Sequence, residues 1–127
     1  MDSSWWLDTK PKFEGTRWCH QQCAGTNRLL PLAFVNSGAA AIELAVQAGA
    51  PRVTLLGYDM GYAPDGQRHW HEDHTGSGGN AGGIENWPRL FKNLAPRLKG
   101  VKVINASRRT ALTMFERRTL EQELSDG

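Results

Sequence analysis

The chain has 127 residues, with fifteen Lys and Arg against thirteen Asp and Glu, which gives a formal net charge of +2 at pH 7. This length predicts a single domain, residues 1–127, and a 39% hydrophobic content with fourteen glycines excludes collagen-like and disordered chains. No apolar run approaches the roughly 18 residues needed to cross a bilayer, so we expect no membrane association, and the near-neutral charge disfavours nucleic acid as a partner.

The first 35 residues are expected to form an irregular N-terminal segment. Weak alternation over residues 16–22 is compatible with a strand. Cys19 and Cys23 are the only cysteines; a structural zinc site needs four ligands, so we expect two reduced thiols. The sequence does not open with a basic segment followed by an apolar stretch, so we expect no signal peptide and a cytoplasmic location.

A helix followed by a strand is predicted next. Residues 39–48 are rich in strong helix formers, and Ser37 is the predicted N-cap. Gly49 is expected to end the helix in a left-handed conformation, and Pro51 prevents its continuation. The apolar run within residues 52–59 then predicts a buried strand.

A long loop, a second helix and a second strand follow. Residues 60–83 are rich in Gly and His without sustained periodicity, which predicts a functional or disordered loop. Apolar residues spaced by three and four over residues 84–98 predict a helix, with Pro88 in its first turn and Pro96 near its end. Residues 101–107 predict a second buried strand, and residues 119–124 a short terminal helix.

Alternating strands and helices predict an α/β fold with a mostly parallel sheet and flanking helices, in a three-layer Rossmann-like arrangement. A doubly wound domain normally has five or six strands and a Gly-rich turn after the first. Neither is found in this sequence. We therefore expect the C-terminal half of a larger doubly wound fold, completed by a missing N-terminal half or by a homo-oligomeric partner.

The histidine-rich stretch at residues 69–74 is the first candidate site. His69, His71, Asp73 and His74 match the H-x-H-x-D-H metal-binding signature of the metallo-β-lactamase superfamily, and such ligands can hold a divalent metal, Zn²⁺ or Mg²⁺. A polar turn precedes the motif and no histidine follows it, unlike that superfamily. The alternatives are a generic metal site and a solvated loop with incidental histidines.

A second set of motifs resembles a known group of proteins. The motifs are NSGAAA at residues 36–41, LLGYDM at 55–60, H-W-H-x-D-H at 69–74 and VINAS at 103–107. Together they resemble a set of phage and prophage proteins. More distantly they are similar to bacterial family-42 sialyltransferases and motility accessory factors. The resemblance covers about residues 34–124.

The resemblance implies a nucleotide or nucleotide-sugar ligand in a bacterial cytoplasm. Asn36, Ser37 and Gly38 match the segment that contacts the nucleotide in those enzymes. A helix N-terminus independently favours anions, because its free N–H groups point toward the ligand.

The same resemblance implies catalytic and substrate-binding roles further along the chain. Tyr58 and Tyr62 match tyrosines that bind the leaving phosphate, and Asp59 lies in the same motif. His74 is the nearest match to the general base, with His71 and His69 as competitors.

Polar residues at the ends of the predicted strands complete the candidate site. Asn105 and Ser107 follow the second strand, and ligands of open α/β sheets bind outside the carboxyl ends of the strands. Alternatively, these two side chains satisfy local backbone groups. Residues 108–109 and residues 117–118 are two pairs of adjacent arginines. They either bind phosphate or lie solvated on the surface.

Three functions remain open. The first is a nucleotide- or nucleotide-sugar-binding, glycosyltransferase-like domain, which as a fragment is either active or inactive. The second is a metal-dependent hydrolase or metal-binding module. The third is a non-enzymatic prophage remnant or interaction domain.

Overall fold

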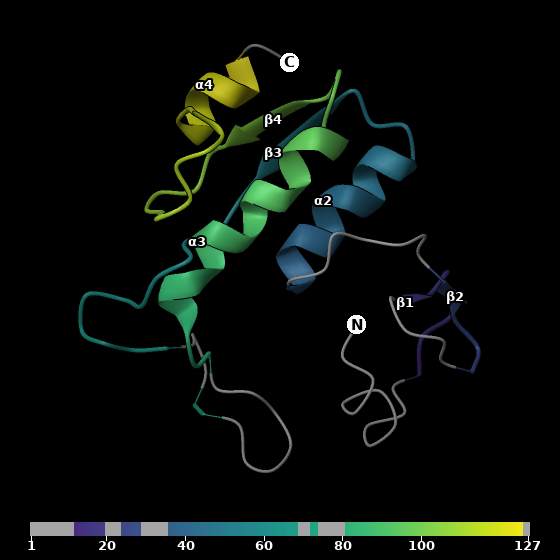
Figure 1. Cartoon of the computed structure of the whole chain (residues 1–127), viewed down its shortest axis with the longest axis horizontal. Helices are drawn as coiled ribbons and strands as arrows, with labels where there is room; N and C mark the ends of the chain where they lie inside the picture. The colour runs from purple at the N-terminus through teal and green to yellow at the C-terminus, as the bar shows by residue number, and fades with distance from the viewer. Residues whose placement is uncertain (1–11, 20–23, 29–35, 69–71, 74–80, 126–127) are drawn as a thin grey trace.

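A computed structural model describes residues 12–19, 24–28, 36–68, 72–73 and 81–125. It combines helices with parallel strands in small sheets, so the α/β class and the parallel sheet predicted from the sequence are confirmed (Figure 1). Within the described ranges, no helix has both the length and the apolar character that crossing a membrane requires.

Helix α2, Ser37–Gln47, begins one residue earlier than its predicted cap implies. Its N-cap is Asn36, whose backbone is extended and whose Oδ1 accepts a hydrogen bond from the Ala39 N–H at 2.9 Å. The prediction of Ser37 as the cap is therefore wrong. Asn caps as well as Ser does, and here Ser37 is the first residue with helical hydrogen bonding. Gly49 follows the helix with φ 86°, as predicted.

The main sheet has the strand order β3-β4-β5, with both pairs parallel. Its strands are β3 (Arg52–Leu55), β4 (Lys102–Asn105) and β5 (Glu116–Arg117). Strands β3 and β4 confirm the two predicted strands in shortened form. Gly57 has φ 70°, a left-handed conformation that turns the chain away from the sheet soon after β3.

A second, two-stranded sheet pairs β1 (Trp18–Cys19) with β2 (Asn27–Arg28) in parallel. Two residues of the predicted 16–22 strand are therefore in β1. The positions from 20 onward in that prediction lie outside the described residues.

The predicted helix over residues 84–98 forms as three consecutive segments. They are η1 (Ile84–Asn86), α3 (Trp87–Leu90) and η2 (Phe91–Arg97), and η1 and η2 are 3₁₀ helices. Pro88 is in the first turn of α3, as predicted. Pro96 lies inside η2, where its missing N–H removes a donor that an α-helix would use. The segment ends one residue later.

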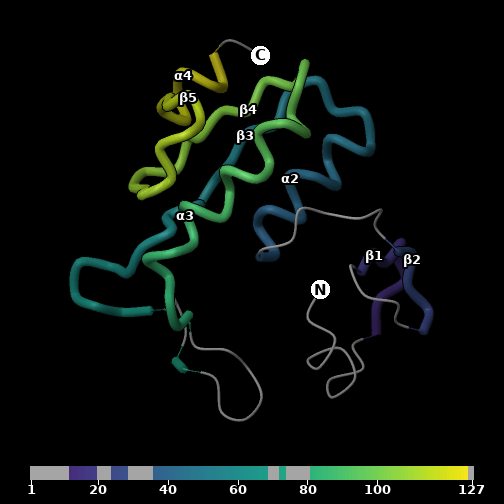
Figure 2. Tube along the Cα trace, viewed as in Figure 1, coloured from purple at the N-terminus to yellow at the C-terminus, as the bar shows by residue number. Residues whose placement is uncertain are grey.

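The core lies between the sheet and these helices, and Figure 2 traces the chain around it. Its side chains come from α2, β3, η2, β4 and the segment before β5. They are Ala39, Ile42, Leu55, Phe91, Leu94, Val103, Leu112 and Phe115. Fully burying an aliphatic or aromatic side chain of this kind contributes about 1.5–3 kcal/mol.

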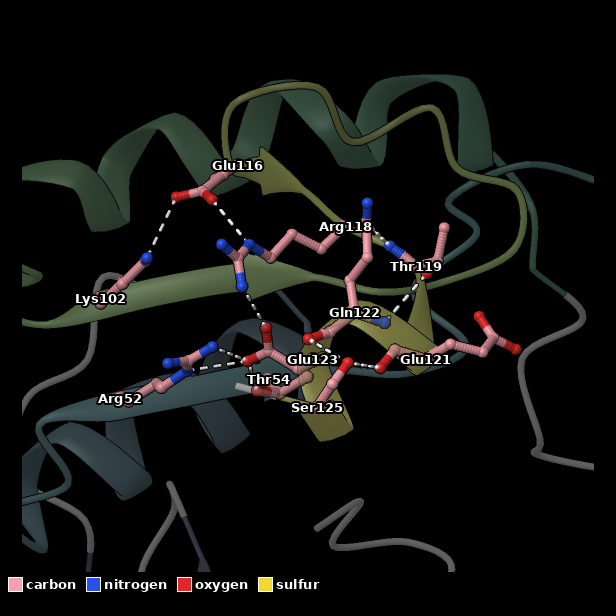
Figure 3. A network of polar contacts seen from close by, with 10 residues as sticks. All are labelled: Arg52, Thr54, Lys102, Glu116, Arg118, Thr119, Glu121, Gln122, Glu123 and Ser125. Atoms are coloured by element: carbon pink, nitrogen blue, oxygen red, sulfur yellow. Dashed lines mark hydrogen bonds and ion pairs between the residues drawn. The ribbon is translucent and has the colours of Figure 1, made fainter. Parts of the chain in front are cut away.

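Helix α4 (Leu120–Ser125) confirms the predicted terminal helix and is held by a polar network. The Glu123 carboxylate accepts hydrogen bonds from Arg52 Nε and Thr54 Oγ1, each at 2.8 Å. Thr119 and Gln122 form a reciprocal capping box at its start (Figure 3). Thr54, which bonds to α4, is followed in β3 by Leu55, which is part of the core. Successive strand residues point to opposite faces, so α4 lies on the face of the sheet opposite the core.

Candidate functional site

The loops that follow β3 and β4 are joined by hydrogen bonds. The Tyr58 N–H donates to Ser107 Oγ at 2.8 Å, and the Ala111 N–H donates to the Asp59 carbonyl at 2.7 Å. The Thr110 hydroxyl donates to the Tyr58 carbonyl. These bonds fix the backbone on both sides of Asp59 and hold the two loops at one edge of the sheet.

Asn105 organises the loop after β4 from a fully buried position. Its Oδ1 accepts from the Ser107 N–H at 3.0 Å, and its Nδ2 donates to Thr110 Oγ1 at 3.2 Å. The Thr110 hydroxyl also accepts from the Leu112 N–H at 3.0 Å. Burying an amide without hydrogen bonds is costly, and here each end of the amide has a partner.

A cavity of about 660 Å³ opens between these two loops. Its volume lies within the range of about 300–1,000 Å³ common for small-molecule sites. The lining comes from the loop after β3 and from the loop after β4: Asp59, Gly61, Tyr62, Ala63, Gln67, Arg68, Arg109, Thr110 and Ala111.

A tight turn presents part of this lining. The Ala63 N–H donates to the Gln67 carbonyl at 3.0 Å, and the Gly66 N–H donates to the Ala63 carbonyl at 2.9 Å. Asp65 Oδ1 accepts from the Gln67 N–H at 3.0 Å. The turn therefore fixes its own backbone and leaves the Gln67 and Arg68 side chains at the cavity wall.

The charges in the cavity lining are two arginines and one carboxylate. Arg68 forms an ion pair with Asp73 in which both side chains are 45% exposed. Arg109 is exposed and makes no ion pair with any residue that the structure describes. The exposed Asp59 carboxylate supplies the negative charge. Guanidinium groups match the planar, bidentate geometry of phosphate and carboxylate oxygens.

The start of α2 lies beside the same end of β3. The Tyr58 hydroxyl donates to the Gly38 carbonyl at 3.1 Å, and the Tyr58 ring packs edge-on against Phe91 with centroids 6.2 Å apart. Burial raises the pKa of the Tyr58 phenol above its usual value. This tyrosine therefore remains a neutral hydrogen-bond donor at pH 7.

Backbone strain occurs directly after Asp59. Met60 has φ 50°, in the left-handed region that non-glycine residues rarely adopt. Its side chain packs against the core, which offsets a conformational cost of about 1–2 kcal/mol. Strained residues of this kind concentrate at functional sites.

The structure divides the predicted site residues into three groups. Asp59 and Tyr62 line the cavity, although the Tyr62 hydroxyl also donates to the Ala81 carbonyl at 3.0 Å. Tyr58, Asn105 and Ser107 hold the loops together through the bonds described above. The third group, at residues 36–38, forms the start of α2, where Ser37 is exposed.

The predicted metal ligands lie mostly beyond the described part of the chain. His69, His71 and His74 are outside the described residues, so the metal and general-base predictions for them stay predictions. Among the residues that are described, no group of three or more His, Cys, Asp or Glu is arranged to hold a metal ion. Asp73, the remaining member, is paired with Arg68.

Most of the cavity lining was not predicted from the sequence, including the polar residues Gln67 and Arg68. The Asp65-Gly66 pair, a common turn sequence, is the signal that marks their position. Arg109 was weighed only as half of a charge pair. Its place in the cavity depends on the hydrogen bonds of Asn105 and Thr110, which no local pattern reveals.

Comparison with protein-family models, with curated proteins and with solved structures found no significant match to this chain.

Proposed function

We propose that this chain binds the phosphate of a nucleotide or nucleotide-sugar in the cavity at the carboxyl edge of the β3–β4–β5 sheet. The observation that carries the proposal is that Arg68, in the loop after β3, and Arg109, in the loop after β4, both line this one cavity. Ligands of open α/β sheets bind outside the carboxyl ends of the strands, which is where this cavity lies.

We also propose that the domain is glycosyltransferase-like, of phage or prophage origin, and acts in a bacterial cytoplasm. Asp59 supports a transfer reaction because its exposed carboxylate lines the same cavity as the two arginines. A carboxylate there is a candidate general base for an acceptor hydroxyl, alongside the loop histidines His71 and His74. The parallel sheet supports a Rossmann-like, three-layer fold as the larger context.

Isothermal titration with CMP, UDP and GDP tests the binding proposal. Arg109→Gln and Arg68→Gln each remove a charged hydrogen-bond donor worth about 1.5–3 kcal/mol. We therefore expect each to weaken binding by about 10- to 100-fold. Arg89→Gln, an exposed arginine in α3, is the matched control and should bind normally. The proposal is wrong if the native chain binds none of the three nucleotides with or without Mg²⁺, or if all three variants behave alike.

Transfer is tested separately from binding. A nucleotide-sugar incubated with the protein and a glycan acceptor should release free nucleotide, and Asp59→Asn should slow that release without abolishing nucleotide binding. Binding without release would leave a nucleotide-binding module and contradict the transferase proposal.

A further inference from the structure

Tyr62 brings an aromatic ring to a cavity wall that is otherwise polar or made of small residues. The side chain lines the cavity and is 41% exposed. Among the lining residues that the structure describes, it is the only aromatic one. An exposed aromatic ring surrounded by polar groups is a common mark of a place where a ligand packs. The ring therefore offers a contact of a different kind from the charged contacts of the two arginines.

The hydroxyl group of Tyr62 is anchored to a distant part of the chain. It donates to the Ala81 carbonyl at 3.0 Å, and the two residues are 19 positions apart. Ala81 is buried and lies just before η1, which leads into the segment that packs in the core. The bond therefore ties the ring to the packed part of the molecule, although its own loop is exposed.

The same bond limits what Tyr62 can offer a ligand. A phenol has a single proton to donate, and here that proton is used by the Ala81 carbonyl. Phosphate oxygens are hydrogen-bond acceptors, so the anchored hydroxyl has no donor left for them. What remains available to a ligand is the surface of the ring.

Strained backbone occurs at both ends of this anchor. Met60, just before Tyr62, has φ 50°, and Ala81, the acceptor, has φ 51°. In the part of the chain that the structure describes, these two are the non-glycine residues with positive φ. Such conformations persist only where surrounding contacts hold them, and they concentrate at active sites and ligand clamps. The position of the ring is therefore set by the fold itself.

We propose that the Tyr62 ring stacks against the base of the nucleotide whose phosphate Arg68 and Arg109 bind. This inference rests on the proposed function, because it concerns the same ligand in the same cavity. Every nucleobase has a π-face that stacks on aromatic side chains. Because the bond to Ala81 already holds the ring, stacking on it costs little side-chain entropy.

The proposal defines the class of ligand that the cavity prefers. Stacking uses the face of a base and no hydrogen bond, so it tolerates different bases. Tyr62 therefore selects nucleotides over phosphate compounds that lack a base, and it does not select one base over another.

Isothermal titration with CMP, GMP and ribose 5-phosphate tests the preference, because the third ligand keeps the sugar and the phosphate and lacks the base. The native chain should bind the two nucleotides about 5- to 100-fold more tightly, the range expected for one stacked base. Equal affinity for all three would overturn the stacking proposal and leave phosphate binding intact. If none of the three binds, the phosphate proposal fails and this inference fails with it.

Three variants separate the ring from the hydroxyl. Tyr62→Leu should reduce the affinity for CMP and GMP to about that for ribose 5-phosphate, whose own affinity should not change. Tyr62→Phe keeps the ring and should keep the preference for nucleotides. Trp18→Leu is the matched control and should change no affinity, because Trp18 is an aromatic residue with a similar exposure, 40%, outside the cavity lining.

Two results with these variants would contradict the proposal. A nucleotide preference that survives in Tyr62→Leu would place the base elsewhere. Weaker binding of ribose 5-phosphate by Tyr62→Phe would mean that the hydroxyl binds phosphate. If Tyr62→Leu fails to fold, NMR of the native chain with CMP decides the question. Nuclear Overhauser contacts between the base protons and the Tyr62 ring are expected, and their absence in the bound complex would overturn the proposal.

Discussion

The hydroxyl group of Tyr58 donates a hydrogen bond to the backbone carbonyl of Gly38, with an O···O distance of 3.1 Å. This contact joins the loop after β3 to the first turn of α2 and sets how closely the two approach. A Cβ atom added at Gly38 would lie 3.0 Å from Tyr58 Cε1 and 3.3 Å from Asn36 Oδ1. Packing alone therefore favours glycine at this position, whatever ligand binds nearby, because Tyr58 and Asn36 would have to give way to accept a side chain.

Gly38→Ala should lower the free energy of unfolding by about 1–3 kcal/mol, the usual cost of an added methyl group in a packed site. The Tyr58 ring must move, and it is already packed edge-on against Phe91. Urea denaturation followed by circular dichroism measures the effect. Gly82→Ala is the matched control, because no atom lies within 4 Å of a Cβ built there. Equal stability of both variants would contradict this account.

Asn36→Ala should destabilise the chain by about 1 kcal/mol, since it removes the side chain that caps α2. Ser37→Ala should change stability by less than about 0.5 kcal/mol, as is usual for an exposed surface position. Asn36→Asp should retain most of the native stability because aspartate caps equally well. Thermal unfolding of the three variants ranks them. If Ser37→Ala lowers the stability more than Asn36→Ala does, Ser37 and not Asn36 is the residue that caps the helix.

The sequence predicted elements well where a strong local pattern coincided with a stop signal. Helix α2 is bounded by a polar cap and Gly49. Strands β3 and β4 are four residues long and carry apolar residues that mark them, Val53 and Leu55 in β3 and Val103 and Ile104 in β4. Strand β5 has no such pattern: its Glu116 and Arg117 are charged, and its position is set by pairing with β4. The helix over residues 84–98 was located correctly, but its proportion of 3₁₀ turns was not predicted.

The sequence predicted the position of the candidate site better than it predicted what each residue does there. The rule that ligands bind at the carboxyl ends of strands located the edge. It does not distinguish a side chain that binds ligand from one that holds a loop, and Asn105 and Ser107 form internal hydrogen bonds here. For Ser107 the distinction depends on its bond to Tyr58, 49 positions away in the chain, which periodicity does not encode. For Asn105 it depends on how the loop after β4 folds back onto the buried amide.

The network at α4 makes the stability of the chain depend on pH. The hydrogen bonds from Arg52 and then Thr54 lower the pKa of the Glu123 carboxyl below its usual value of about 4.3 (Figure 3). A lowered pKa in the folded chain stabilises the fold above that usual value. This contribution is lost as the pH falls through the lowered pKa, when the carboxylate is protonated.

Glu123→Gln should therefore lose stability at pH 7 and show a smaller further loss than the native chain between pH 5 and pH 2. Urea midpoints measured across that range give the comparison. Glu85→Gln, at an exposed position outside this network, should keep the native pH dependence. If Glu123→Gln retains the full native slope, the carboxylate does not contribute to acid sensitivity.

Asp73→Asn distinguishes the phosphate site from a metal site. The Asp73 carboxylate is paired with Arg68 at the cavity wall, so an incoming phosphate must compete with it for the same guanidinium. Removing the charge should tighten nucleotide binding by about two- to fivefold, because an exposed ion pair contributes about 0.2–1 kcal/mol.

A metal site that uses Asp73 predicts a weaker affinity for Zn²⁺ in the same variant. Titrations of CMP, UDP, GDP and Zn²⁺ against the native and Asp73→Asn chains give both readouts. Unchanged or weakened nucleotide binding would remove Arg68 from the phosphate site and leave Arg109 as its cation.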